Sequence, residues 1–472
     1  MEFLNRGITF LNGIVWGYVL VYSLLGVGLY FTIRMRFVQV RLFKRAIIVM
    51  LGGFKAATPG GISPFQAFAT GLASRVGTGN IAGVAIAISL GGPGAVFWMW
   101  ITALVGMASS VVECSLAQLF KVRQRNHTFR GGPAYYIQMG LGRRGLSVAF
   151  ALALILCFGL VFNAVQTNTI AAVFGSAYKV PPWVVGLVIV AFTAPVIFGG
   201  IHRVAVLAEF LVPFMAVLYL GIAGFCVFRH LGEIPEAIAL IVRSAFGLEQ
   251  AVGGFTGHTI SQAMTTGIKR GLFSNEAGMG SAPNAAATAT ASHPVSQALL
   301  QMVGTFVDTI IVCSATAFLI LLSGIYKPGD SKIGVHLTEA ALRAEIGPVG
   351  NHFLAIAILF FSFSSIIGNY VYAEGNVKLI RNSPRMIFIF RLLVLGMVFF
   401  GAVGSVPMVW NMADLSQATM AMINLVAIML LSGVALKLVN DYESQLRSGS
   451  GKPVFTRDRM PELEDKLPRD VW

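Results

Sequence analysis

Long apolar stretches recur along nearly the whole chain and constrain its fold more than any other feature. Crossing the hydrocarbon core of a bilayer takes about 20 helical residues. Inside a bilayer the backbone amides need partners within the protein, so only helices or a closed barrel can span it. The stretches here are long and do not alternate with period two, and 56% of the 472 residues are hydrophobic. The sequence therefore predicts an all-α polytopic membrane protein.

We predict about eleven transmembrane helices. The seventh stretch is too long and too polar for one plain helix, and we expect it to be broken. The N-terminus lacks a basic region followed by a short apolar segment and a cleavage site, so we predict no cleaved signal peptide. The predicted spans are 11–33, 64–90, 94–120, 147–175, 182–199, 204–228, 251–291, 297–324, 352–376, 385–405 and 411–438.

Basic residues gather in alternate loops. Segments 34–63 and 121–146 each carry six Lys or Arg and no acidic residue, whereas the loop at 91–94 is GGPG. Loops rich in Lys and Arg face the cytoplasm, so we place the N-terminus outside the plasma (inner) membrane and the C-terminus in the cytoplasm. These loops explain the net charge of +14, and we expect no nucleic-acid partner. All four cysteines fall in predicted spans, where we expect thiols and no disulfides.

The second and seventh predicted spans resemble each other at an offset of 195 residues. Five spans separate their starts, so they cross the membrane in opposite directions, as in an inverted repeat. We predict an extra N-terminal helix with its basic loop (1–63), two five-helix repeats (64–250 and 251–440) and a solvated cytoplasmic tail (441–472). The identical pairs are Thr70/Thr265, Arg75/Arg270, Asn80/Asn275, Ala82/Ala277 and Gly83/Gly278.

The second span contains SRVGTGNIAGVA (74–85), which is unusually polar and glycine-rich for mid-membrane. Gly77 and Gly79 flank Thr78 and weaken the helix. An unwound turn at this depth must be buried in protein or line a cavity. There it offers amides to an anion and carbonyls to a hard cation such as sodium. The alternative, a small-residue packing face, is less favoured because the seventh span carries a matching anomaly.

The seventh span reads TTGIKRGLFSNEAGMGSAPNAAATA, and its glycines predict a break around GLFSN. We expect Phe273, Ser274 and Asn275 to act at this break. Lys269 and Arg270 are costly in lipid. The sequence does not decide between a functional role for them and a cluster near the cytoplasmic interface that keeps a gate shut.

Polar side chains in other spans point to the same interior. Ser364 and Ser365 can bond to their own helix or supply oxygens to sodium, and Asn369 lies one turn beyond Ser365. The amide of Gln166 needs a partner or a ligand. Three intramembrane acids, Glu113, Glu209 and Asp308, are functional candidates by default. Arg75 would pair with one of them, and Asp308 suits structural pairing better than proton relay.

The sequence shows no catalytic machinery. The seven histidines are scattered without metal-ligand spacing, and no nucleophile motif surrounds Ser274. We therefore predict that the protein is not an enzyme and has no cofactor.

Five motifs together resemble the alanine/glycine:cation symporter family: SRVGTGNIAGVA, AISLGGPGAVFWMW, FRGGPAYY, GLFSNEAGMGS and SSIIGNYVYAE. The resemblance covers about residues 10–440. It implies the five-plus-five fold of the neurotransmitter:sodium symporters and sodium-coupled, or sometimes proton-coupled, uptake of alanine or glycine.

The resemblance also implies roles for individual residues. The amides of Thr78, Gly79 and Asn80 would meet the substrate carboxylate, and Gln166 would line the pocket. Sodium would be held by the carbonyls of Ala73 and Val76 with the hydroxyls of Ser364 and Ser365.

Asn369 departs from many family members, which carry tryptophan or another bulky residue there. A smaller polar residue enlarges the pocket, so a sodium- or proton-coupled glutamine symporter is the alternative. A passive channel is the rival from another class.

Overall fold

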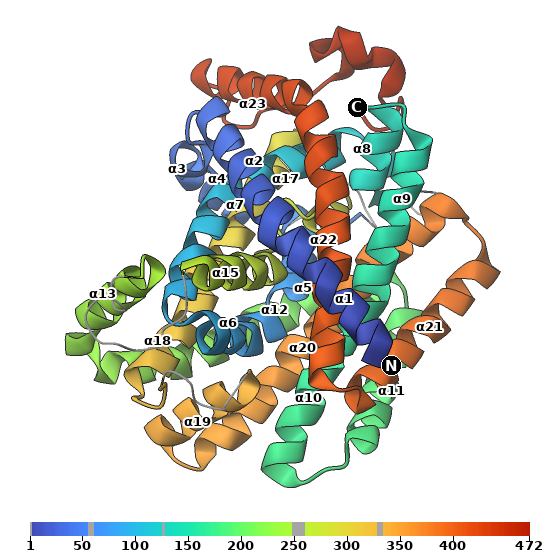
Figure 1. Ribbon diagram of the computed structural model, residues 1–472. Helices are drawn as coiled ribbons and strands as arrows, with labels where there is room; N and C mark the ends of the chain where they lie inside the picture. The colour runs from blue at the N-terminus through green and yellow to red at the C-terminus, as the bar shows by residue number, and fades with distance from the viewer. Residues whose placement is uncertain (1, 55–60, 125–127, 248–259, 328–333) are drawn as a thin grey trace.

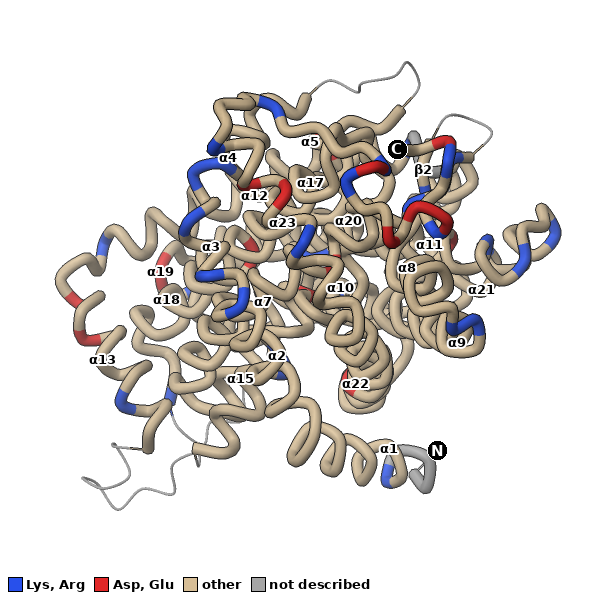
Figure 2. The backbone as a smooth tube through the Cα atoms, turned by 90° about the horizontal axis from the view of Figure 1, so that it is seen from above, with Lys and Arg blue, Asp and Glu red and all other residues tan. Residues whose placement is uncertain are grey.

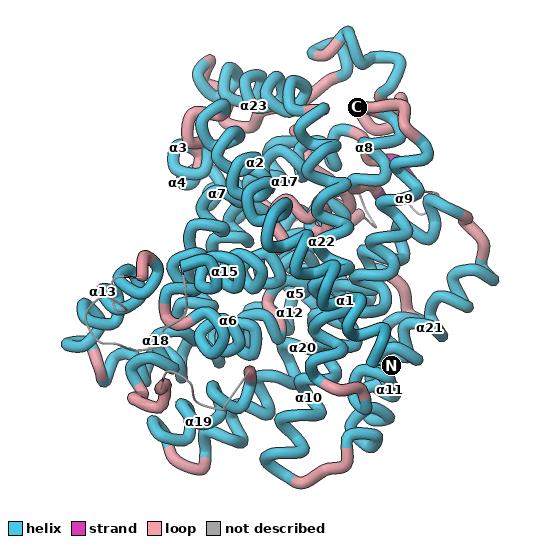
Figure 3. Tube along the Cα trace, viewed as in Figure 1, coloured by secondary structure: helices cyan, strands magenta, loops and turns pink. Residues whose placement is uncertain are grey.

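The computed structural model describes residues 2–54, 61–124, 128–247, 260–327 and 334–472. Within these ranges the chain is almost entirely helical (Figure 3). The strands in this part of the chain are β1 (Val122–Arg123) and β2 (Phe129–Arg130), which pair antiparallel with Val122 opposite Arg130. The prediction of an all-α protein is confirmed.

The helices follow one another with short connections, and several contain π-helical or 3₁₀ turns labelled η. The first half comprises α1 (Glu2–Ile14), η1 (Val15–Leu20), α2 (Val21–Arg34), α3 (Val38–Arg41), α4 (Phe43–Gly52), α5 (Pro64–Arg75), η2 (Gly79–Gly83), α6 (Val84–Gly91), α7 (Gly94–Leu119), α8 (Pro133–Met139), α9 (Arg144–Leu154), η3 (Ile155–Val161), α10 (Phe162–Tyr178), α11 (Pro182–Phe198), α12 (Ile201–Arg229), η4 (Leu231–Glu233) and α13 (Ile234–Ala245). The second half comprises α15 (Ile260–Asn275), α16 (Ala282–Ala286), α17 (Pro294–Thr305), η5 (Phe306–Cys313), α18 (Ser314–Leu322), α19 (Val335–Ile346), α20 (Val349–Ile380), α21 (Pro384–Val403), α22 (Val406–Leu430), α23 (Ser432–Arg447), η6 (Arg457–Arg459) and η7 (Pro461–Lys466).

Among the described residues, eight helical segments are long and apolar enough to cross a membrane. A ninth span is the pair α5 and η2–α6, which is bent by 48° at a short break. Of the other predicted spans, α11 has 17 residues and falls short of that length, and part of 251–291 lies outside the described residues. The structure thus establishes a polytopic helical protein with eight or nine spans, and the number eleven stays a prediction.

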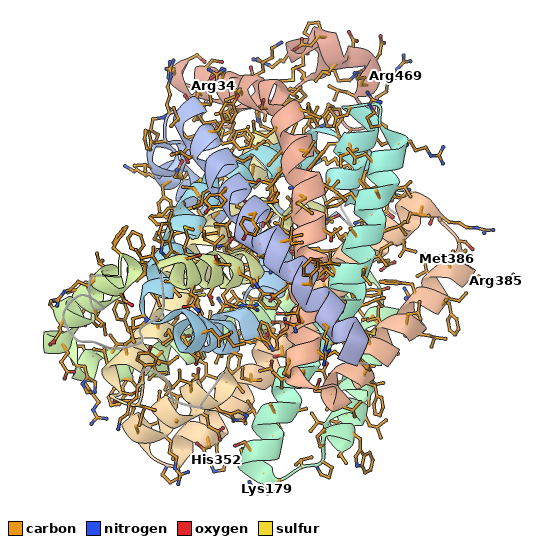
Figure 4. All side chains as sticks on the ribbon, viewed as in Figure 1. Arg34, Lys179, His352, Arg385, Met386 and Arg469 are labelled. Carbon is orange, nitrogen blue, oxygen red and sulfur yellow. The ribbon has the colours of Figure 1, made fainter. Side chains whose placement is uncertain are left out.

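Charged residues lie at both ends of the molecule. Lys179 and His352 lie at one end and Arg34 and Arg469 at the other (Figure 4). Seen from above, Lys and Arg gather around α3, α4 and α23 (Figure 2). The helices near the centre of this view, such as α10, α17 and α20, carry few charged residues (Figure 2). This distribution is that of a protein embedded in a bilayer, with polar caps on either side of an apolar belt.

The two interrupted helices occupy the interior: one is α5 with η2 and α6, and the other is α15 with α16. Helix α7 packs against α15 and α17, and α20 packs against α5, α10 and α12. The first span, from α1 to α2, crosses the front of the molecule diagonally and packs against α22 (Figure 1). The first span therefore lies at the periphery of the molecule, and its standing outside two repeats stays a prediction.

The C-terminal segment differs from its prediction in two respects. The last span ends at Leu430 instead of 438, because the chain turns at Leu431 and α23 crosses the end of the molecule (Figure 1). The prediction that the tail is solvated is also wrong. Phe455, Met460 and Leu467 are buried, and apolar side chains of this kind keep a short tail on the helix ends because burial removes them from water.

Candidate functional site

The break in the second span begins where α5 ends. Ser63 and Gln66 form a reciprocal cap at the start of α5. At its other end Val76 leaves the helical conformation with ψ 89°. The amide of Gly77 then donates to Oδ1 of Asn80 at 2.9 Å. In a continuous helix that amide would bond to Ala73, so the turn leaves the carbonyl of Ala73 without its partner in the helix.

Two hydroxyls of α20 approach this carbonyl. Ser365 Oγ lies 3.1 Å and Ser364 Oγ 3.4 Å from the carbonyl oxygen of Ala73. Both also donate to the carbonyl of Phe361 one turn earlier. The serines therefore bond within their own helix and also contact the broken span, and their role as sodium ligands stays a prediction. Val76 is buried at the C-cap of α5, and these hydroxyls form no hydrogen bond with it.

No side chain fits at Gly77. A Cβ atom there would lie 2.2 Å from Ser365 Oγ and 3.1 Å from Gln166 Oε1. Glycine is thus favoured at this position by the close approach of Ser365.

The three amides predicted to receive a carboxylate differ in their present partners. The amide of Thr78 donates to Gln166 Oε1 at 3.1 Å, and that of Asn80 donates to the carbonyl of Gly77. Gly79 starts the π-helical turn η2. The structure brings Gln166 to the break, as the resemblance implied.

The seventh span is interrupted as predicted, but a few residues later. Phe273, Ser274 and Asn275 are the last residues of α15, and the non-helical stretch is 276–281. Three of its residues have positive φ: Glu276 at 59°, Gly278 at 82° and Gly280 at 88°. These left-handed conformations end the helix there, because it cannot continue through positive φ. The glycines within α15 itself are tolerated by packing.

The start of η2, just after the first break, lies against the end of α15, just before the second. A Cβ atom on Gly79 would lie 3.0 Å from Phe273 Cδ1 and 3.2 Å from the Cα of Ser274. The ring of Phe273 packs between Phe162, at a centroid distance of 4.5 Å, and Trp410, at 5.0 Å. The backbones of the two interrupted helices therefore meet beside a cluster of three aromatic rings, Phe162, Phe273 and Trp410.

Asp308 joins the two interrupted helices. Its Oδ1 accepts from Asn80 at 2.7 Å, and its Oδ2 accepts from Ser274 and Thr309, each at 2.8 Å. The carboxyl group is fully buried in the π-helical turn η5. Structural pairing, the interpretation that the sequence favoured, is what this structure shows.

The other ionisable residues have separate partners. Glu113 accepts from the amide of Gly278 at 3.1 Å and from Asn424 at 2.8 Å, and Glu209 accepts from Gln66. Arg75 was expected to pair with an acid. Instead its guanidinium donates to the carbonyl of Gln301 at 3.0 Å.

Asn369 does face the site. Its Oδ1 accepts from Ser74 Oγ at 2.7 Å, and its Nδ2 donates to Asn163 Oδ1 at 3.1 Å. Ser74 Oγ also lies 2.9 Å from Oε1 of Glu276 in the second break. Sequence reasoning did not single out Ser74 or Asn163. Both could have been found from the sequence, because Ser74 adjoins the glycine-rich break and Asn163 lies three residues before Gln166.

The cations of the seventh span form one cluster. Lys269 Nζ lies 3.2 Å from Asp414 Oδ2, and Arg270 forms an ion pair with Oδ1 of the same carboxylate. The guanidinium also stacks 4.7 Å from the ring centre of Trp410. Asp414 lies near the start of α22, far along that helix from α23. The cluster therefore lies away from the end of the molecule that carries the tail.

Apolar helices on the scale of a bilayer, with two interrupted helices meeting in a polar interior, define a polytopic membrane transport protein. The sequence model described as the sodium:alanine symporter family matches residues 1–457. This chain belongs to that family.

Relatives match it over nearly their whole length. The amino-acid carrier protein AlsT of Bacillus subtilis is 49% identical over 98% of this chain and 97% of its own. The probable sodium/glutamine symporter GlnT of the same organism is 48% identical, covering 95% and 92%. The sodium/alanine symporter AgcS of Methanococcus maripaludis is 39% identical, covering 96% and 100%.

Among solved structures, a mutant of the manganese transporter of Eremococcus coleocola superposes with a TM-score of 0.52. The alignment covers 85% of this chain and 91% of that one at 15% identity. At this identity the likeness concerns the fold alone.

Proposed function

We propose that this protein is a sodium-coupled symporter that carries a small neutral amino acid, alanine or glycine, across the plasma membrane. The observation that carries the proposal is the meeting of two interrupted helices, with the carbonyl of Ala73 turned toward Ser365 of α20. An interrupted helix inside a membrane offers both amides and carbonyls to ligands, as the two charged ends of a zwitterion and a cation require.

The amino acid is proposed to lie between the two breaks. Its carboxylate would be received by the amides of Thr78, Gly79 and Asn80, which begin the second half of the broken span. Gln166 now accepts from Thr78, and it would have to turn toward the substrate when the carboxylate arrives. Phe273, Ser274 and Asn369 would line the remaining sides.

Sodium is proposed to sit beside Ala73. The carbonyls of Ala73 and Val76 and the hydroxyls of Ser364 and Ser365 form an all-oxygen set, which suits a hard cation. Ser364 and Ser365 already approach the carbonyl of Ala73 within 3.4 Å. A sodium ion would draw these oxygens into its coordination sphere in place of the bonds to Phe361.

Transport is proposed to follow alternating access between two inverted repeats, residues 64–250 and 251–440, with the N-terminus outside and the C-terminus in the cytoplasm. In that orientation Lys269, Arg270 and Asp414 lie in the outer half and close the outer path. Each ligand must bind one state better than the other for coupling, typically by 1–3 kcal/mol.

A glutamine symporter is the second candidate, because Asn369 replaces a bulky residue and a relative named as a probable sodium/glutamine symporter is 48% identical. Proton coupling is a variant of either candidate, since another relative is named a putative sodium/proton-dependent alanine carrier.

Uptake into proteoliposomes tests the proposal. Labelled alanine, glycine and glutamine are supplied separately, with a sodium or a proton gradient imposed alone. We expect alanine or glycine to accumulate above its outside concentration with sodium only. Equilibration without accumulation would identify a channel, and accumulation of glutamine in preference to alanine would identify the second candidate.

A further inference from the structure

A cleft of about 540 Å³ opens at the end of the first span, where the turn from α2 into α3 meets α23. Four arginines line it, Arg34, Arg36, Arg41 and Arg447, with Glu443 as the one acidic residue of its lining. Figure 4 shows Arg34 at the top of α2, beneath α23.

The positive charge of the cleft is only partly neutralised. Arg41 contacts both carboxylate oxygens of Glu443, at 2.7 and 3.0 Å, and Arg447 lies 3.4 Å from the same carboxylate. Arg34 and Arg36 have no ion-pair partner within the described chain, and both are exposed. The cleft therefore offers an excess of three positive charges to a ligand.

The backbone of this turn is unusual. Arg36 and Phe37 both have positive φ, 52° and 56°, a left-handed conformation that costs a non-glycine residue about 1–2 kcal/mol. Arg41 stabilises the turn by donating to the carbonyls of Arg36, at 2.7 Å, and Met35, at 2.9 Å. The result is that Phe37 is displayed outward beside the arginines, with 56% of its surface exposed.

Exposed apolar residues neighbour the arginines of the cleft in the sequence. Ile33 is 58% exposed and Val40 is 72% exposed, and the span to which Ile33 belongs ends at Arg34. Exposed apolar side chains next to arginines, Ile33 beside Arg34 and Phe37 beside Arg36, match the two parts of a phospholipid. Basic pockets beside membrane helices bind anionic headgroups through this charge complementarity.

We propose that this cleft binds one anionic phospholipid, with its phosphate between Arg34, Arg36 and Arg447 and its acyl chains along Ile33, Phe37 and Val40. A free phosphate would use the arginines but gain nothing from the apolar surface. The adjoining apolar residues therefore favour a lipid as the source of the phosphate. The site is distinct from the amino-acid and sodium sites, since it lies outside both interrupted helices.

Native mass spectrometry of the purified full-length protein tests the proposal. Phosphatidylglycerol, phosphatidylcholine or inorganic phosphate is added separately, and bound adducts are counted. We expect phosphatidylglycerol to be retained in preference to phosphatidylcholine. The variant Arg34→Gln/Arg36→Gln/Arg447→Gln should weaken its binding about a hundredfold, on the basis of roughly fivefold for each arginine near the headgroup.

Two further variants test whether lipid binding depends on the charges of this cleft and on the apolar side chain of Phe37. Arg143→Gln/Arg144→Gln removes exposed charge at the start of α9, outside the cleft, and should leave phosphatidylglycerol binding unchanged. Phe37→Asn keeps the turn, because asparagine tolerates positive φ, but removes the acyl contact. It should weaken binding of the lipid and not of inorganic phosphate.

Three results would overturn the proposal: equal retention of both lipids, full retention of phosphatidylglycerol by the triple variant, or binding of inorganic phosphate with no effect of Phe37→Asn on the lipid. If the triple variant does not fold, Arg34→Gln alone and Phe37→Asn decide the matter, because both side chains are exposed.

Discussion

The hydroxyl oxygen of Ser365 lies 3.1 Å from the carbonyl oxygen of Ala73, across the interface between α20 and the broken second span. The carbonyl is available because Gly77, which would be its partner in a continuous helix, donates to Asn80 instead. The break therefore leaves a backbone oxygen at mid-span that does not bond within its own helix, and α20 places a hydroxyl beside it. We expect a cation at this place to be bound by the two helices jointly.

Replacing Ser365 with alanine should raise the sodium concentration needed for half-maximal uptake. One lost oxygen ligand is worth about 1 kcal/mol, or roughly fivefold in affinity. Ser362→Ala is the matched control, since Ser362 is buried in the same helix and its hydroxyl has no partner in the described structure. An unchanged sodium dependence of Ser365→Ala in proteoliposome uptake would contradict the proposed ion site.

Alanine at Gly77 should abolish transport, whereas alanine at Gly83 should not. The new methyl group at position 77 would lie 2.2 Å from Ser365 Oγ, and relieving such an overlap costs about 1–3 kcal/mol and displaces the site. At Gly83 the nearest atom to a Cβ is 3.9 Å away. Uptake and expression of the two variants are measured in the same experiment. Equal uptake would show that transport does not require the close packing of Gly77 against Ser365.

Proline at Thr78 tests the carboxylate donor. Thr78 has φ −58° and ψ −25°, which proline adopts without strain, so the main loss is the amide hydrogen now donated to Gln166. We expect amino-acid binding to be lost. Thr78→Val keeps the amide and removes a hydroxyl that has no partner in the described structure, so it should bind normally. Binding of labelled alanine to purified protein separates the two, and normal binding by Thr78→Pro would exclude this amide as a substrate donor.

The sequence was informative where a local rule acts. Glycines around Thr78 predicted an interruption because helix propensity and close packing are local properties, and the structure breaks there. In the seventh span the composition indicated a break but not its position, because α15 runs through Gly267 and Gly271 on tertiary packing. The left-handed residue Glu276 ends it instead.

Partnerships between distant residues were beyond sequence reasoning. Arg75 was expected to meet an acid, yet it bonds to the carbonyl of Gln301, 226 residues away. The choice depends on how α5 lies against α17, which no local pattern encodes. The tail was misjudged for a similar reason: its few apolar residues are too sparse to fold alone, but the helix ends provide a surface on which they are buried.

Acidification should destabilise the folded protein through His293. Burial lowers the pKa of this histidine to about 4. Its Nδ1 accepts from the amide of Val295 at the start of α17, and its Nε2 lies 3.1 Å from Asp441 in α23. Protonation would remove the acceptor for Val295.

The sign of the pH effect on stability follows from the lowered pKa of His293. Because the pKa is below the usual value of about 6.5, the neutral ring favours the folded state above pH 6.5. That contribution, up to about 3 kcal/mol at 1.36 kcal/mol per pKa unit, is lost as the pH falls from 6.5 through 4. His293→Asn should retain the helix cap and remove this dependence. Thermal unfolding of the original protein and of His293→Asn, measured from about pH 7 to about pH 4, compares the pH dependence of their stability. Identical pH profiles would show that His293 does not titrate in this window.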